Sequence, residues 1–169
     1  MYWIGDIVVH SGHGVCRITD KKTNPEMNKD FFQLKTVSNQ LTIMIPEDKV
    51  DEFLRPVSSK DFFLQNLDLT KGKAINYSKD NKERRNQFQT LLSSNRLQDT
   101  LLLLKSLYSL ADEKKKERKM LGSFDSQFFQ QALKKASEEL MFSMNLSKTE
   151  ALELLEKTLK IQPVYQYSK

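Results

Sequence analysis

The sequence has little of what metal-binding and catalytic sites are made of. It contains one cysteine, Cys16, and two histidines, His10 and His13. A single cysteine cannot form an internal disulfide, which suits a reducing compartment. These three side chains are also too few for a structural zinc site with four protein ligands. We therefore predict no metal site, and we interpret Cys16 as a small buried hydrophobe rather than as a nucleophile.

Long apolar runs and phosphate-binding loops are missing too. No apolar stretch approaches the roughly 20 residues that cross a bilayer, and the first residues do not have the pattern of a signal peptide. There is no glycine-rich phosphate loop and no Gly-x-Ser-x-Gly motif. We expect a cytoplasmic protein that is not an enzyme, with no catalytic residues, no cofactor, no membrane contact and no small-molecule substrate.

Positive charge is present, but it is unevenly distributed. The formal net charge is +5, in a chain with 38% hydrophobic and 29% charged residues, which is compatible with a folded protein. Residues 1–57 contain seven basic and eight acidic residues, whereas residues 58–169 contain twenty and fourteen. Because the basic excess lies in the second part, a phosphate-binding surface is expected there.

The first 57 residues have the pattern of a small β module. The β-branched residues of 6–10 predict a strand, and the Ser11–Gly14 turn predicts a hairpin whose second strand resumes at Val15. Residues 19–29 are predicted to be a loop. Two further strands are predicted at 31–37 and 41–45, the last closed by Pro46. Together these four strands indicate a bent antiparallel sheet or a Tudor/SH3-like barrel.

The rest of the chain has helical periodicity. We predict a short helix over 60–67, a linker over 68–79, and a compact helical bundle over 80–162. Ser147 and Glu150 form a capping-box pattern before the last helix, which Pro163 ends. The predicted fold is therefore α+β, with a β module over 1–57, a helix and linker over 58–79, and a helical domain. Trp3, the single tryptophan, is expected in the core.

The order of residues in the β module resembles that of the CarD/CdnL family of bacterial transcription regulators. The opening Gly5–Ile18 matches the family pattern, although Cys16 replaces a glycine. The match continues through Phe32-Gln33-Leu34, through Leu41–Pro46 and at Arg55. Weaker matches occur in the helical part, at Ser93-Ser94-Asn95, Lys119-Met120-Leu121 and Glu138-Glu139-Leu140. The same β module occurs as the polymerase-interacting domain of transcription-repair coupling factors.

This resemblance implies two partners for a bacterial, nucleoid-associated protein. The β module would bind the β subunit of RNA polymerase through an exposed sheet edge, and the helical domain would contact promoter DNA largely independently of sequence and stabilise the open complex. The residues expected at polymerase are Arg17, Lys21, Lys22, Lys35 and Met44. Those expected at DNA are Tyr77, Lys79, Lys82, Arg84 and Arg85. Tyr77 stands near the position where many family members place a DNA-wedging tryptophan.

Three alternatives remain open on the sequence. The basic residues of 71–88, with a net charge of +4, also fit a solvated helix start. The missing tryptophan allows a protein-only adaptor that docks on polymerase or another partner without a DNA wedge. An enzyme with a site between the two domains is a further alternative, but few titratable groups lie outside the helical patterns.

Overall fold

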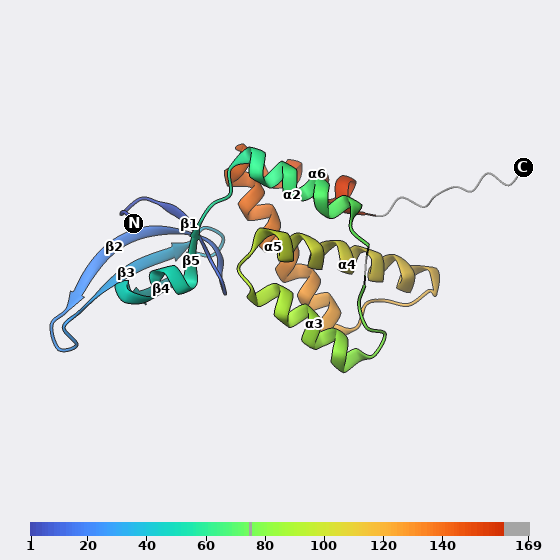
Figure 1. Ribbon diagram of the computed structural model, residues 1–169, viewed down its shortest axis with the longest axis horizontal. Coiled ribbons are helices and arrows are strands. Elements are labelled where there is room, and N and C mark those ends of the chain that lie inside the picture. The colour runs from blue at the N-terminus through green and yellow to red at the C-terminus, as the bar shows by residue number, and fades with distance from the viewer. Residues whose placement is uncertain (75, 161–169) are drawn as a thin grey trace, which may run out of the picture.

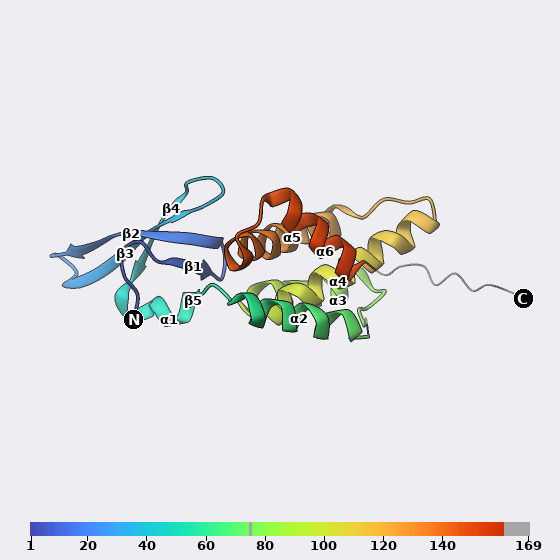
Figure 2. The same cartoon turned by 90° about the horizontal axis from the view of Figure 1, so that it is seen from above.

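The computed structural model describes residues 1–74 and 76–160. A β-sheet forms one end of the elongated molecule and a group of helices forms the other (Figures 1 and 2). The strands are β1 (Ile7–His10), β2 (Gly14–Asn24), β3 (Lys29–Thr36), β4 (Thr42–Pro46) and β5 (Leu54–Pro56). A 3-10 turn, η1 (Glu47–Lys49), and a short helix, α1 (Val50–Phe53), connect β4 to β5. The predicted α+β fold is confirmed.

The five strands form one antiparallel sheet in the order β4-β3-β2-β1-β5. The predicted first hairpin is present, and its pairing runs from Ile7 opposite Arg17 to His10 opposite Gly14. Gly14 has a φ of +77°, a conformation that costs glycine little and that side-chain-bearing residues rarely adopt. Glycine at this position therefore lets the chain reverse tightly into β2.

Two features of the sheet differ from the sequence prediction. The segment predicted as a loop over 19–29 is mostly strand, because β2 continues to Asn24 and pairs with β3 beyond an irregularity after Ile18. The Thr23 hydroxyl and the Asp30 carboxylate, 2.7 Å apart, join the two strands near their far ends. The fifth strand, β5, was not predicted, since three residues ending in proline carry no periodic signal.

The sheet has its own core. Val8, Cys16 and Leu34 are buried in one cluster with neighbours from β4 and β5. Cys16 is thus buried as expected, and burial raises the pKa of its thiol to about 12, which makes it unreactive. Trp3 was wrongly expected in the core: its side chain is 65% exposed, and its backbone N–H donates to the Asp6 carboxylate at 2.8 Å.

The helical part consists of α2 (Lys60–Gly72), α3 (Asn81–Ser93), α4 (Leu97–Lys116), α5 (Ser123–Met144) and α6 (Lys148–Leu159). Helix α4 packs against α2, α3 and α5, and its leucines are buried on several sides. The α6 capping box at Ser147 and Glu150 is present as predicted. Pro163, expected to end this helix, lies outside the described residues. None of the helices in the described ranges is long and apolar enough to cross a membrane.

Helix α2 is longer than predicted and belongs to the helical core. Ser59 caps its start by accepting a hydrogen bond from the Phe62 backbone N–H. Phe63 and Leu67 are buried among the residues of the other helices. The stretch predicted as a linker from residue 68 therefore begins inside a packed helix. A helix with only a few apolar residues on one face is stable when neighbouring helices cover that face.

Candidate functional site

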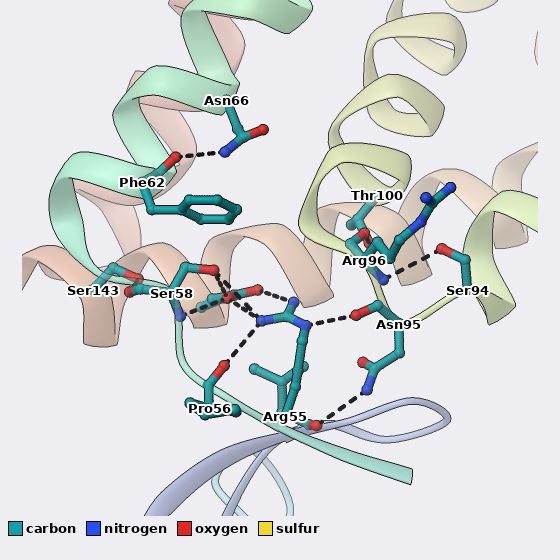
Figure 3. A network of polar contacts seen from close by, with 12 residues as sticks. Arg55, Pro56, Ser58, Phe62, Asn66, Ser94, Asn95, Arg96, Thr100 and Ser143 are labelled. Carbon is teal, nitrogen blue, oxygen red and sulfur yellow. Dashed lines mark hydrogen bonds and ion pairs between the residues drawn. The ribbon is translucent and has the colours of Figure 1, made fainter. Parts of the chain in front are cut away.

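The two parts of the molecule meet at Arg55, which lies on β5 (Figure 3). Its guanidinium forms a bidentate ion pair with Glu139 of α5, with Nη1–Oε1 at 2.6 Å and Nη2–Oε2 at 2.7 Å. Its Nε donates to the carbonyl of Asn95, between α3 and α4, at 2.6 Å. Bidentate arginine–carboxylate pairs fix geometry as well as charge. Arg55 therefore joins the sheet to α5 and to the connection between α3 and α4 at one point.

Glu139 is nearly inaccessible to solvent, and further donors complete its coordination. The Ser58 backbone N–H and hydroxyl donate to Oε1 at 3.0 and 2.6 Å (Figure 3). The Ser143 hydroxyl donates to the Ser58 carbonyl at 2.7 Å. A buried carboxylate is stable only with such a full set of partners. The chain leaving the sheet is consequently held against α5.

A lysine reinforces the same junction. Lys135 of α5 donates through Nζ to the Ser11 carbonyl in the first hairpin at 2.6 Å and to the Leu92 carbonyl in α3 at 2.9 Å. Burial, and then the nearby Arg55, lower the pKa of Lys135 to about 8. The sequence comparison matched Arg55 and Glu139 separately to a family pattern, but only the fold brings the two together.

Four of the five residues expected at polymerase lie on one face of the sheet. Arg17 on β2 pairs with Lys35 on β3, which pairs with Thr42 on β4; Met44 stands opposite Gln33. Lys22 lies on this face as well, opposite Phe31. Among the described strands β4 lies at one edge of the sheet, so its outer backbone groups are open to another strand. Met44, on that edge, is 46% exposed.

A surface hollow of about 570 Å³ lies beside this edge, bordered by Lys22, Phe31 and Met44. Lys21 is separate from it, on the opposite face of the sheet. Its ammonium pairs with Glu47 at 2.8 Å, and the cation lies 5.4 Å from the centre of the Phe32 ring. The sequence placed Lys21 and Lys22 together, but neighbours on a strand point to opposite faces.

Two of the five residues expected at DNA pack within the helical domain, Arg84 buried and Tyr77 partly buried. Arg84 is 7% exposed and forms a two-point ion pair with Asp125 of α5, with Nη2–Oδ2 at 2.8 Å and Nε–Oδ1 at 3.2 Å. The Tyr77 ring packs edge-on against Phe88, with ring centres 6.1 Å apart. Both side chains are thus engaged in contacts within the helical domain.

The other three residues, Lys79, Lys82 and Arg85, are exposed around the start of α3. The Arg85 guanidinium stacks 3.8 Å from the ring centre of Phe124, which begins α5 and is 51% exposed. We call these four residues the basic end. The sequence predictions did not include Phe124.

The basic end lies away from the sheet. Helix α3 ends beside the junction, where Leu92 bonds to Lys135. Helix α5 contacts the junction through Glu139, near its C-terminal end. Phe124 lies in its first turn, at the opposite end of the helix. At a rise of about 1.5 Å per residue, helices of these lengths place their starts roughly 20–30 Å from their ends. The open strand edge and the basic end thus occupy separate parts of the elongated molecule (Figure 1).

His10 has a structural role in the first hairpin. The Nδ1 of His10 accepts a hydrogen bond from the Gly12 backbone N–H at 2.9 Å, and the ring stacks on Phe53. Burial lowers the pKa of His10 to about 4, with the neighbouring His13 as the next cause. In the described part of the chain, no three residues with metal-binding side chains lie together.

The described structure thus presents the open β4 edge of the sheet and the basic end of the helices at separate places. Residues 2–58 match the family model described as the CarD-like/TRCF RID domain. The resemblance found in the sequence is thereby confirmed. The match supports an RNA polymerase-interacting, transcription-related protein, built on a protein-interaction domain that is not an enzyme. No curated protein matches the chain.

Proposed function

We propose that this chain is a non-enzymatic transcription regulator that docks on the β subunit of RNA polymerase and holds promoter DNA in the open complex. The observation that carries the proposal is the family match of residues 2–58, on a domain whose β4 edge is open. An open edge can accept a strand from a partner, with main-chain hydrogen bonds giving affinity and side chains giving specificity. Lys35, Met44 and the hollow beside Met44 would supply that specificity.

The basic end supports the DNA contact. Lys79, Lys82 and Arg85 are exposed cations that can neutralise phosphates without reading sequence. Phe124 adds an exposed apolar ring beside Arg85, and apolar side chains of this kind favour unstacked base steps. Phe124 is more exposed than Tyr77, which is partly buried against Phe88. Such a contact stabilises the open complex only as far as it binds the open state more tightly than the closed one.

The junction around Arg55 gives these two surfaces a fixed relation. A protein that docks on polymerase with one domain must bring the other to a defined stretch of DNA. The Arg55–Glu139 pair and the Lys135 contacts hold the sheet against α3 and α5. We infer that this rigidity directs the basic end toward the upstream edge of the melted promoter DNA in the open complex. The protein would be bacterial and would work at the nucleoid.

The test is the lifetime of open complexes. Polymerase of the host is bound to a promoter with and without the chain, and the open complexes are challenged with a competitor. The intact chain should lengthen the lifetime, and Lys79→Ala/Lys82→Ala/Arg85→Ala should lose most of that effect. Lys60→Ala/Lys157→Ala removes exposed lysines elsewhere and should behave like the intact chain. An unchanged lifetime with the intact chain would contradict the proposed role.

A protein-only adaptor is the second candidate. It is favoured by the burial of Arg84 and the partial burial of Tyr77, which leave fewer side chains free for DNA than the sequence indicated. In that case the helical domain would contact a protein instead. Polymerase binding would then be intact, while the basic-end variant and the control variant would give the same open-complex lifetime.

A further inference from the structure

A second cavity lies between the two domains, at the other side of α5 from the Arg55 contacts. It has a volume of about 630 Å³ and is lined by the turn after β3, by α5 and by α6. Its apolar walls are Val37, Leu133, Met141, Phe142 and Leu152. Small-molecule sites have volumes of roughly 300–1,000 Å³ and are common where domains meet. The cavity therefore has the size, the lining and the position of a ligand site.

The charged side chains that line this cavity differ in their exposure to solvent. Lys134 and Lys148 line it and are exposed, and in the described part of the chain neither forms an ion pair. Glu138 also lines it but is only 9% exposed. Its Oε2 lies 3.0 Å from where a Cβ on Gly14 would be, so this oxygen faces the sheet. Lys134 and Lys148 both act electrostatically on the Glu138 carboxylate, but Glu138 is buried while both lysines are exposed, so a ligand entering from solvent meets the two ammonium groups first.

We propose that this cavity binds a small amphipathic anion. Its apolar body would lie against Leu133, Met141 and Leu152, and its carboxylate or phosphate head group would lie beside Lys134 and Lys148. Val37 comes from the sheet domain, whereas the other lining groups named here come from the helical domain. A bound ligand therefore stabilises the relative placement of the two domains. This site is independent of the proposed polymerase and DNA contacts.

Isothermal titration of the full chain with octanoate and with octyl phosphate tests the proposal. Octyltrimethylammonium, which has the same apolar tail and the opposite charge, is the matched probe. Both anions should bind saturably and the cation should not. Lys134→Ala/Lys148→Ala should weaken binding of the anions roughly five- to tenfold. The control Lys60→Ala/Lys157→Ala removes the same charge elsewhere and should leave binding unchanged.

Three results would overturn the proposal: no saturable binding of either anion, equal binding of the cation, or equal affinities of the two double variants. Circular dichroism confirms that the variants fold, which is expected because all four lysines are exposed. Sedimentation of the intact chain and of the Phe142→Ser variant tests whether a second copy of the chain occupies the cavity instead. A dimer that this substitution dissociates would assign the cavity to a second copy of the chain, and so would also overturn the proposal.

Discussion

Arg55 of the sheet domain and Glu139 of the helical domain, which are 84 residues apart in the chain, form two hydrogen bonds with each other. The carboxylate is almost fully buried, and the guanidinium is partly so. Such a pair is costly to break from one side, because the remaining charge stays buried without a partner. The pair therefore fixes how the two domains sit together.

Glu139→Gln should lower the free energy of unfolding by at least about 2 kcal/mol, because it removes the charge that Arg55 and Ser58 coordinate. Urea denaturation followed by circular dichroism measures this. Glu52→Gln, at the exposed Lys49–Glu52 pair, is the control and should change stability by about 0.5 kcal/mol or less. Equal effects of the two substitutions would show that the junction contributes nothing to stability.

Arg84 and Arg85 are adjacent in the sequence but have different roles. Arg84→Ala leaves Asp125 buried without its partner and should cost about 3–5 kcal/mol of stability. Arg85→Ala removes an exposed contact with Phe124 and should cost at most about 1 kcal/mol. Thermal or urea unfolding of both variants checks this. If Arg85→Ala were the more destabilising of the two, the assignment of Arg84 to the core would be wrong.

His10 should make stability depend on pH. Because burial lowers the pKa of the folded-state imidazole from 6.5 to about 4, the unfolded chain binds the proton more readily between those values. The stabilising contribution of neutral His10 is therefore present above pH 6.5 and is lost as the pH falls toward 4. The expected loss is about 2–3 kcal/mol. His10→Asn removes this titration while keeping a possible acceptor for the Gly12 N–H.

Urea unfolding of both proteins between pH 4 and pH 7 isolates the His10 contribution. The difference in stability between the intact chain and His10→Asn should shrink as the pH falls. Glu138, whose pKa burial raises, titrates in both proteins and cancels in the comparison. A difference that is constant over this range would contradict the burial of neutral His10.

The DNA contact should depend on salt. Each phosphate neutralised by a lysine or arginine adds about 0.9 to the slope of log affinity against log salt on duplex DNA. Lys79→Ala/Lys82→Ala/Arg85→Ala should therefore reduce the slope by roughly 2 to 3. Fluorescence anisotropy with labelled promoter DNA over a series of salt concentrations measures it. Lys60→Ala/Lys157→Ala is the comparison, and identical slopes in both variants would exclude the basic end as the DNA surface.

Local patterns predicted much of the fold. The first hairpin followed from Gly14 and the valines before it, and the last helix followed from the Ser147–Glu150 capping box. Strand β5 escaped prediction because only its pairing with β1 makes it a strand. Long-range pairing of that kind leaves no periodic trace in three residues.

The functional surfaces were harder to predict than the fold. Arg84 and Arg85 have the same side chain, and only the packing of α3 on α5 decides which one is buried. The same applies to Tyr77 and Phe124, where the expected aromatic is packed inside and an unexpected one is exposed. Sequence indicated a basic segment correctly, but it could not assign each side chain to core or solvent.

The central claim is that the β4 edge docks on RNA polymerase. Co-purification of the intact chain with core polymerase of its host tests this claim. The variant Lys35→Glu/Met44→Glu alters exposed side chains on β4 and on the neighbouring strand β3. Lys60→Glu/Leu69→Glu makes the same changes on exposed positions of α2 and is the control. We predict that the intact chain and the control bind and that the edge variant does not. Polymerase binding that survives the edge substitutions, or that the intact chain lacks, would contradict the account.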